Sequence, residues 1–350
     1  MVKNFIKITT TNILILLTFV FFAELFFGYW FDKDNLGPFM REHRMKNQKI
    51  EYESGGKKEI YFYRRNYHGF RGKDIHPSEI KAIFLGPSTI EQKYEPERFT
   101  ITGFLNSNFK KEGLNLEIVN AGVEAQSTKG MIMGFKNWLF KLENFSPKII
   151  LLYVGSNDHS LQGDRNNESS INEGNLLNSN TIEQFMDNIK SRSIILDSIR
   201  IFKFKYLPRK RFVKYDGNQD LELKKSFNYK SYKKATEEFD LTQLKIMNEK
   251  IINSYLTRID ELNSLSAELN SIPIFVTNIT SGGYGAKDYV FNSSLMEHCK
   301  KMNYRCIDVA KKLKINLSYW KDSIHTTNAG SKAIAEIIFY DLKKIISELN

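Results

Sequence analysis

The 350-residue chain has only two cysteines and seven prolines. A disulfide-rich scaffold is therefore excluded, because such scaffolds need several cysteine pairs in a short chain. Hydrophobic residues make up 41% and charged residues 26% of the chain, which excludes a chain that is disordered throughout or collagen-like. The chain is long enough to bury a large core without cross-links, and its length is typical of about two domains.

Cysteine and histidine spacing typical of a metal site is also missing from the sequence, so we predict no metal. Four histidines, His43, His68, His76 and His298, have no neighbouring partner pattern. Two interpretations of the cysteines stay open. Cys299 and Cys306, seven positions apart, either form a disulfide outside the cytoplasm or are two small buried hydrophobic residues.

One long apolar run covers residues 13–31, with Glu24 as its only charge. At the rise of an α-helix these residues span about 28 Å, close to the thickness of a bilayer core. No small-x-small cleavage site follows, so the run predicts a transmembrane signal anchor. Lys3 and Lys7 precede it, which places the N-terminus in the cytoplasm and the rest of the chain outside it, in a bacterial cell envelope.

The positive charge is concentrated in one internal segment. The whole chain carries +11, while residues 190–234 hold 14 Lys/Arg and 4 Asp/Glu, a net +10, with eight aromatics between positions 202 and 232. We interpret residues 160–234 as an insertion that is either a solvated charged loop or a cap that binds anionic lipid or an acidic polymer. Nucleic acid is disfavoured as a partner, because the predicted topology removes this segment from the cytoplasm.

Five short apolar runs alternate with helix-compatible segments in the remainder of the chain. Buried strands that alternate with helices indicate an α/β fold with a mostly parallel five-stranded sheet covered on both faces. The runs lie at residues 80–85, 116–119, 148–154, 273–278 and 304–309.

Polar residues follow several of these strands, at the edge of a parallel sheet where ligands bind. The first run is followed by Gly-Pro-Ser-Thr at 86–89, the second by Asn-Ala-Gly at 120–122, and the third by Gly-Ser-Asn-Asp at 155–158. Asp-Ser-Ile-His at 322–325 precedes the last predicted helix. The fold therefore brings a hydroxyl, small and amide groups, and an acid–base pair to one edge.

A catalytic role can be assigned to each of these groups. Ser88 is the candidate nucleophile, His325 the base that takes its proton, and Asp322 the acceptor that fixes the histidine tautomer. The Ser88 N–H, the Gly122 N–H and the Asn157 amide are candidate donors to an oxyanion. His159 is a rival base, but its position after the third strand favours a place in the lining of the cleft.

The four segments resemble, in order, the four blocks of the SGNH/GDSL hydrolase superfamily: Ser88, Gly122, Asn157 in Gly-x-Asn-Asp, and Asp322-x-x-His325. The resemblance covers residues 80–350. It implies a flavodoxin-like three-layer sandwich, esterase chemistry and no cofactor. Asn-x-x-Gly-Phe-Arg-Gly at 66–72 resembles the region before the catalytic domain in membrane-anchored members. Proline stands at 87 where the family usually has aspartate; it removes no N–H assigned to the oxyanion, so we expect the geometry to survive.

These inferences predict three parts: an anchor at 1–32, a connector at 33–79 and a catalytic domain at 80–350 with the insertion. The leading hypothesis is a serine esterase that hydrolyses an acyl ester. The substrate class we favour is an O-acetyl ester on an envelope glycan. An acyltransferase to an envelope polysaccharide and a lipid-directed esterase would use the same residues. The alternative from a different class is a carbohydrate- or membrane-binding module on an inactive hydrolase fold.

Overall fold

The computed structural model describes residues 2–28, 30–31, 47–54, 57–66, 68–124, 126–158, 189, 192–206, 209–215, 229–314 and 316–349. Its central element is a parallel sheet of five strands in the order β4-β3-β5-β7-β8. This confirms the expected fold class. The strands are β3 (Ala82–Leu85), β4 (Ile118–Asn120), β5 (Ile149–Val154), β7 (Ile272–Thr277) and β8 (Arg305–Ile307).

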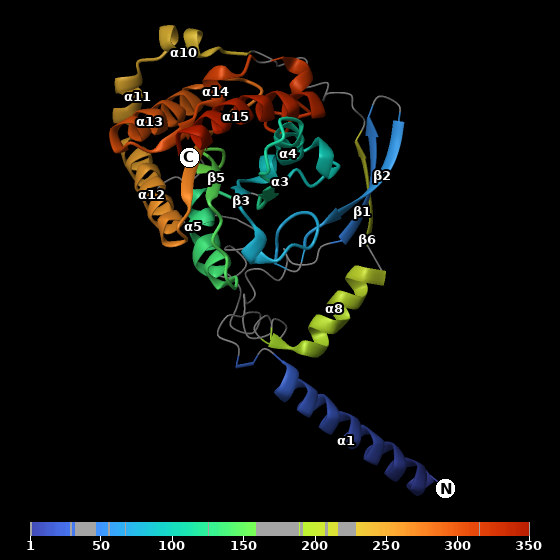
Figure 1. Ribbon diagram of the computed structural model, residues 1–350. Coiled ribbons are helices and arrows are strands. Elements are labelled where there is room, and N and C mark those ends of the chain that lie inside the picture. Colours follow the sequence, from blue (N-terminus) through green and yellow to red (C-terminus); the bar gives the residue numbers. More distant parts are fainter. Residues whose placement is uncertain are drawn as a thin grey trace.

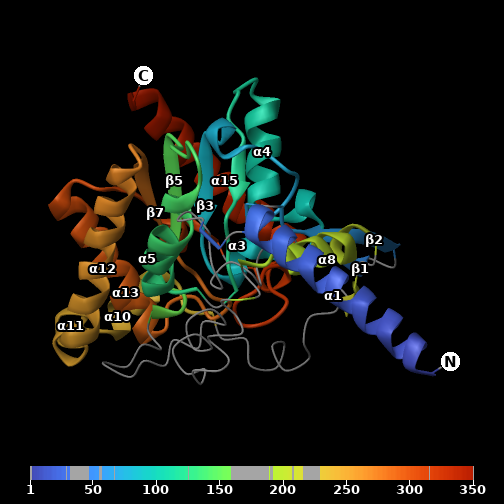
Figure 2. The same cartoon turned by 90° about the horizontal axis from the view of Figure 1, so that it is seen from below.

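Two helical layers cover the sheet, α5, α12 and α13 on one face and α4 and α15 on the other (Figure 2). The larger helices are α4 (Ile101–Lys111), α5 (Thr128–Asn137), α12 (Glu249–Glu268), α13 (Ala286–Met302) and α15 (Asn328–Leu349). The short helices are α3 (Ser88–Glu91), α10 (Tyr232–Glu238), α11 (Leu241–Met247), α14 (Val309–Lys312), and the 3-10 turns η1 (Pro77–Glu79), η2 (Glu97–Phe99), η3 (Leu139–Lys141) and η5 (Leu317–Tyr319).

Strand residues alternate between the two layers, as the side chains of a pleated strand must. Both faces are apolar, which explains why the strands are continuous hydrophobic runs in the sequence. The α5–α12–α13 side receives Ile83, Leu85, Ile150, Leu152 and Phe275, and the α4–α15 side receives Ala82, Phe84, Leu151, Tyr153 and Ile274.

Two of the helix-compatible segments between the strands are divided in the structure. After the first strand, α3 ends at Glu91, its C-cap Gln92 is left-handed (φ 44°), and α4 begins only after Thr100. The segment before β7 divides into α10, α11 and α12, and Asp240 caps α11 by accepting from Thr242 N at 2.8 Å. Local capping and turn chemistry therefore prevailed over the longer periodic pattern.

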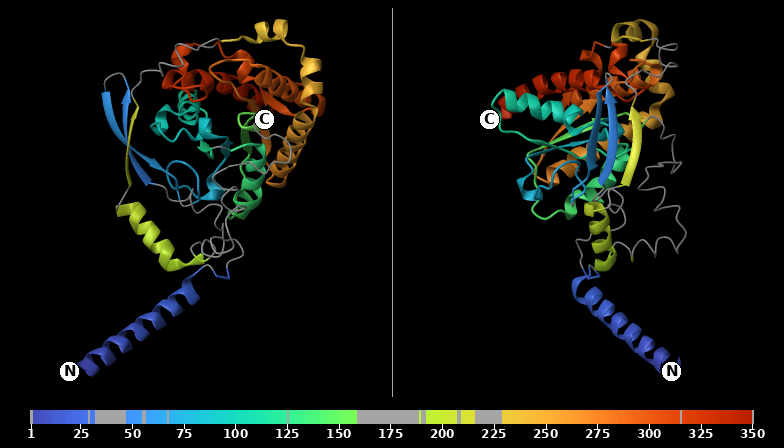
Figure 3. Two further views of the ribbon diagram at one scale, coloured as in Figure 1. Left: turned by 180° about the vertical axis from the view of Figure 1, so that it is seen from behind. Right: turned by 90° about the vertical axis from the view of Figure 1, so that its right-hand side faces the viewer.

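A second, three-stranded sheet lies beside the main body in the order β2-β1-β6 (Figure 3). Strands β1 (Asn47–Ser54) and β2 (Lys57–Arg64) form an antiparallel pair within the predicted connector. Strand β6 (Arg209–Tyr215) pairs with β1 in parallel and comes from the predicted insertion. The described part of the insertion is therefore not a loop, and it also contains α8 (Ile194–Tyr206). Residues 160–188 and 216–228 lie outside the described residues.

The N-terminal apolar segment is one helix, α1 (Val2–Phe27), which projects away from the body (Figure 1). Its part from Phe5 to Phe27 is long and apolar enough to cross a membrane, as a signal sequence or an anchor would be. The helix starts earlier than the expected run at 13–31, and in this first part the Thr9 hydroxyl has a partner within the helix, Phe5 O, at 2.9 Å. It ends at Phe27, before Phe31.

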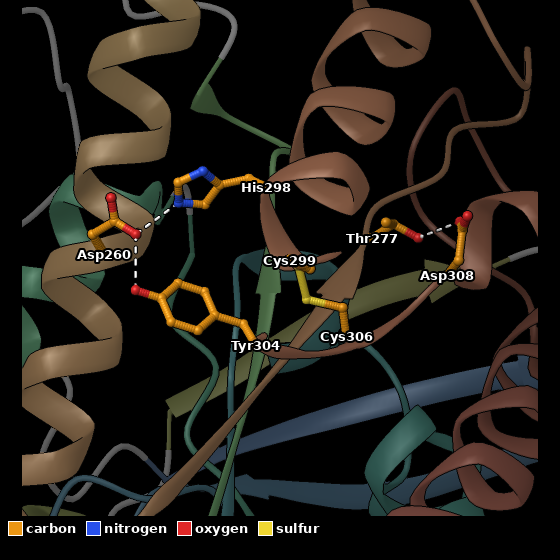
Figure 4. Close-up of a disulfide and its surroundings, with 7 residues drawn as sticks. All are labelled: Asp260, Thr277, His298, Cys299, Tyr304, Cys306 and Asp308. Carbon is orange, nitrogen blue, oxygen red and sulfur yellow. Dashed lines mark hydrogen bonds and ion pairs between the residues drawn. A yellow bond between two sulfur atoms is a disulfide. The ribbon is translucent and has the colours of Figure 1, made fainter. Parts of the chain in front are cut away.

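Cys299 near the end of α13 and Cys306 in β8 form a disulfide (Figure 4). Asn303, left-handed at φ 56°, reverses the chain between them and brings their Cα atoms to 6.3 Å. Beside it, Asp260 accepts from Tyr304 Oη at 2.9 Å and contacts His298 Nε2 at 2.7 Å. The disulfide interpretation of the two cysteines is therefore confirmed. His298, for which the sequence showed no partner, contacts Asp260 of helix α12.

Candidate active site

Ser88 is the first residue of α3 and follows β3 after the tight Gly86-Pro87 turn. The Pro87 carbonyl accepts from Ile90 N at 2.9 Å and from Glu91 N at 3.0 Å, so proline begins the helix without needing an N–H of its own. The turn directs Ser88 to the edge of the sheet at the carboxyl ends of the strands. The proline that departs from the family pattern fits this geometry.

Ser88, His325 and Asp322 form one hydrogen-bonded series. His325 Nε2 lies 3.0 Å from Ser88 Oγ, and His325 Nδ1 lies 2.7 Å from Asp322 Oδ2. The other oxygen, Asp322 Oδ1, accepts the backbone N–H groups of Ile324 at 2.8 Å and His325 at 2.7 Å. The structure thus brings together the three residues that the sequence assigned to a catalytic triad, although they lie up to 237 positions apart.

The charge state of Asp322 follows from these contacts. Burial by itself raises the pKa of this carboxyl, but the hydrogen bonds from the His325 side chain and backbone and from Ile324 outweigh burial and lower the pKa below its ordinary value. Asp322 is therefore a carboxylate at neutral pH. It can hold the Nδ1–H tautomer of His325, which leaves Nε2 to accept the serine proton.

The loop that carries His325 is tied to the end of α3 by Gln92. Gln92 Nε2 donates to Ser331 Oγ at 2.7 Å and to Thr326 Oγ1 at 3.3 Å, while Gln92 Oε1 accepts from Ile101 N at 2.6 Å. The left-handed backbone of Gln92 directs its side chain toward Thr326 and Ser331. Gln92 was not singled out from the sequence, because neither its conformation nor its distant partners have a local signal.

The proposed oxyanion donors are held by partners of their own. Asn157 Nδ2 donates to Gln126 O at 3.1 Å. The Gly122 N–H donates to Asn120 Oδ1 at 3.0 Å, so it would have to exchange that bond to reach an oxyanion. A Cβ at Gly122 would lie 2.3 Å from Glu91 N, so glycine is required for the loop to pack on the backbone of α3.

Asp158, the last residue of the Gly-Ser-Asn-Asp block, fixes the loop that carries Asn157. The buried carboxylate accepts from Gly155 N at 3.2 Å and from Thr128 N at 3.2 Å, and it pairs with Arg258 Nη2 at 3.4 Å. These contacts bind the end of β5 to the first turn of α5. The rival base His159 lies outside the described residues.

No family model and no curated protein matches the chain. Solved structures do match. A member of the lipolytic protein G-D-S-L family from Veillonella parvula DSM 2008 is 14% identical with a TM-score of 0.41, covering 75% of this chain and 97% of that chain. The psychrotrophic esterase EstA from Pseudoalteromonas sp. is 13% identical with a TM-score of 0.40, covering 76% and 99%. Similarity this low does not transfer the activity of these proteins to this chain.

Arg65, which was not identified from the sequence, joins the predicted connector to helix α3. The buried guanidinium donates to Tyr63 Oη at 2.9 Å, to Glu91 Oε1 at 3.2 Å and to the Gly122 carbonyl. Burial raises the pKa of Tyr63, so its hydroxyl keeps the proton that it donates to Glu91 Oε1. A single side chain therefore contacts both α3 and the loop that holds a proposed oxyanion donor.

Arg71, in the Asn-x-x-Gly-Phe-Arg-Gly piece, supports the same C-terminal end of α3 through backbone carbonyls. Its guanidinium donates to the carbonyls of Glu91, Gln92 and Glu95, and the Gln92 contact measures 2.6 Å. These carbonyls end the short helix and would otherwise be buried without partners. The motif noticed in the sequence thus stabilises the turn that follows Ser88.

Replacing Arg65 with methionine should lower the free energy of unfolding by about 3–5 kcal/mol, because Glu91 would remain as a buried charge without its partner. The measurement is urea unfolding of the full chain in detergent. The matched control is Arg98→Met, which breaks an ion pair between Arg98 and Glu59 at the surface and should cost less than about 1 kcal/mol. Equal losses in the two variants would contradict this role of Arg65.

Proposed function

We propose that the chain is a serine esterase that hydrolyses an acyl ester at Ser88. The observation that carries this proposal is the continuous contact from Asp322 through His325 to Ser88 Oγ, with distances of 2.7 and 3.0 Å. A surface histidine in a structural role needs one partner, whereas a general base must contact both a hydroxyl and an orienting acid. His325 has both.

The proposed reaction uses only the residues described. Ser88 Oγ attacks the carbonyl carbon of the ester while its proton passes to His325 Nε2. The tetrahedral intermediate collapses, the alcohol leaves with the proton from His325, and the acyl group remains on Ser88. A water then gives a proton to His325 and attacks the acyl-enzyme, releasing the carboxylic acid and returning the proton to Ser88.

Negative charge forms on the carbonyl oxygen during both steps, and donors must face it. The proposed donors are the Ser88 N–H, the Asn157 amide and, after exchange of its Asn120 bond, the Gly122 N–H. We expect Asn157→Ala to lower kcat about 10²- to 10³-fold with little change in KM, because this donor acts on the transition state. Steady-state kinetics with an aryl acetate measure both constants. A rise in KM alone would remove Asn157 from this role.

An O-acetyl ester on a glycan of the cell envelope is the substrate class we favour. Two observations support a location outside the cytoplasm: α1 has the length and composition of a signal or anchor, and the two cysteines form a disulfide, which persists in oxidising compartments. The His325 and Asp322 side chains are partly exposed, which leaves the triad open to a bulky ester.

Labelling with a fluorophosphonate tests the proposal first, because this probe reacts only with an activated serine. We expect one adduct, on the peptide that contains Ser88, and no adduct in Ser88→Ala. Absence of labelling in the unaltered protein would favour a binding module on an inactive fold. Product analysis with an acetylated glycan, with and without a second acceptor sugar, then separates hydrolysis from acyl transfer.

A further inference from the structure

Glu24, the one charge in the apolar run, contacts the N-terminus of α8. Its carboxylate accepts from Ser193 Oγ at 2.6 Å and from the backbone N–H groups of Ile194 and Ile195, each at 3.2 Å. Trp30 Nε1 donates to it at 3.1 Å. A side chain of α1 thus caps a helix that begins 170 residues later.

These contacts fix the depth at which α8 begins. Glu24 lies three residues before the end of α1 at Phe27, which corresponds to about 4.5 Å along the helix axis. If α1 crosses a bilayer, the first turn of α8 is held at the boundary between acyl chains and headgroups. A carboxylate there needs polar partners, and the N-terminal N–H groups of a helix supply them.

Helix α8 presents exposed apolar side chains along one stripe. Leu196, Ile199, Phe202 and Tyr206, spaced by three or four residues, are 38%, 46%, 55% and 58% exposed. The rings of Phe202 and Tyr206 lie 4.9 Å apart. Residues at this spacing share one face of a helix. A stripe of this kind in water is costly, whereas Leu, Phe and Tyr on one face are typical of helices that lie in a membrane interface.

We propose that α8 is an interfacial helix that lies on the membrane surface, with its Leu196–Tyr206 stripe in the lipid, and that Glu24 pins it to α1. This goes beyond the proposed esterase activity and does not depend on it. Strand β6 follows α8 and pairs with β1, so the interfacial helix is connected to the body by a sheet (Figures 1 and 3). The catalytic unit is thereby held at one distance from the lipid and does not swing on a tether.

The test attaches an environment-sensitive dye to Phe202→Cys in the full chain, whose native cysteines are engaged in the disulfide. The protein is reconstituted into vesicles of phosphatidylcholine and phosphatidylglycerol that contain a lipid with a nitroxide near the headgroup. We expect a blue-shifted emission and loss of most of the fluorescence. The matched control is Tyr340→Cys, exposed on α15 at the end of the body away from α1, where the nitroxide should have little effect (Figure 1).

A second pair of variants tests Glu24. Glu24→Leu removes the cap but keeps α1 apolar, so the quenching at position 202 should fall. Thr18→Leu removes a hydroxyl that bonds only within α1 in the described contacts, to Leu14 O at 2.8 Å, and should leave the quenching unchanged. Unchanged quenching in Glu24→Leu would overturn the role of Glu24.

Quenching at Phe202 as weak as at Tyr340 would overturn the proposal as a whole. A spectral shift of the Phe202 label that appears only on addition of an acidic polysaccharide would also overturn it, in favour of a polymer-binding face. Because none of these measurements uses turnover, an inactive enzyme would not affect the result.

Discussion

Under the proposed esterase function, replacing Ser88 with alanine is expected to lower kcat for ester hydrolysis about 10⁶-fold, as loss of the nucleophile does in serine triad enzymes. The alanine leaves His325 without a hydroxyl to deprotonate, so no acyl-enzyme can form. The turnover of an aryl acetate measures the effect, and circular dichroism shows whether the fold is kept. Ser323→Ala is the matched control, because this exposed serine lies within Asp-x-x-His but outside the triad.

Retention of more than a few per cent of turnover in Ser88→Ala would assign the nucleophile elsewhere. Loss of the circular dichroism signal would point to a structural effect, and the fluorophosphonate adduct on the unaltered protein would then decide the role of Ser88.

Asp322→Asn is expected to lower kcat about 10⁴-fold while the loop keeps its shape. Asparagine can still accept the Ile324 and His325 N–H groups at Oδ1, but its amide places a donor where Oδ2 accepted from His325 Nδ1. The histidine then favours the tautomer with a proton on Nε2, which cannot take the proton of Ser88.

The pH–rate profile gives this prediction a second measurement. The hydrogen bonds to Asp322 lower its pKa, so this carboxyl stays ionised across the neutral range. A histidine base accepts a proton only in its neutral form, so the activity of the unaltered protein should rise with pH through one ionisation. Asp322→Asn should reduce the plateau of that profile. A plateau equal to that of the unaltered protein would mean that another group orients His325.

The sheet and the triad could be predicted because their signals are local. Each strand is a buried apolar run. Ser88 stands just after a strand and His325 just before the last helix, each in a short motif that can be recognised without knowledge of distant partners. The α3 break at Gln92 has no such signal, since a left-handed glutamine looks like any helical glutamine in the sequence. Arg65 could not be assigned because the two partners through which it reaches α3 and the Gly122 loop lie 26 and 57 positions away.

The partners of Glu24 and the pairing of β6 could not be predicted from the sequence for a similar reason. A lone carboxylate in an apolar run has no sequence partner, and its true partners are backbone N–H groups of a distant helix. The Arg209–Tyr215 strand reads as a charged excursion because its pairing with β1 depends on residues more than 150 positions earlier. Long-range pairing of this kind is set by the tertiary structure and leaves little trace in periodicity.

Because β6 pairs with β1, the insertion and the β1–β2 hairpin belong to one sheet. This pairing determines where the chain can be shortened for expression without its anchor. A version starting at residue 80, the predicted domain boundary, would lose Tyr63, Arg65 and Arg71 and would bury Glu91 without a counter-charge. Removing β6 with the insertion would leave the backbone N–H and C=O groups on one edge of β1 unpaired, and such an exposed edge promotes aggregation. The shortest version that folds without the anchor should therefore begin near Asn47, keep the insertion as far as Tyr215, and retain the rest of the chain that forms β7, β8 and α15.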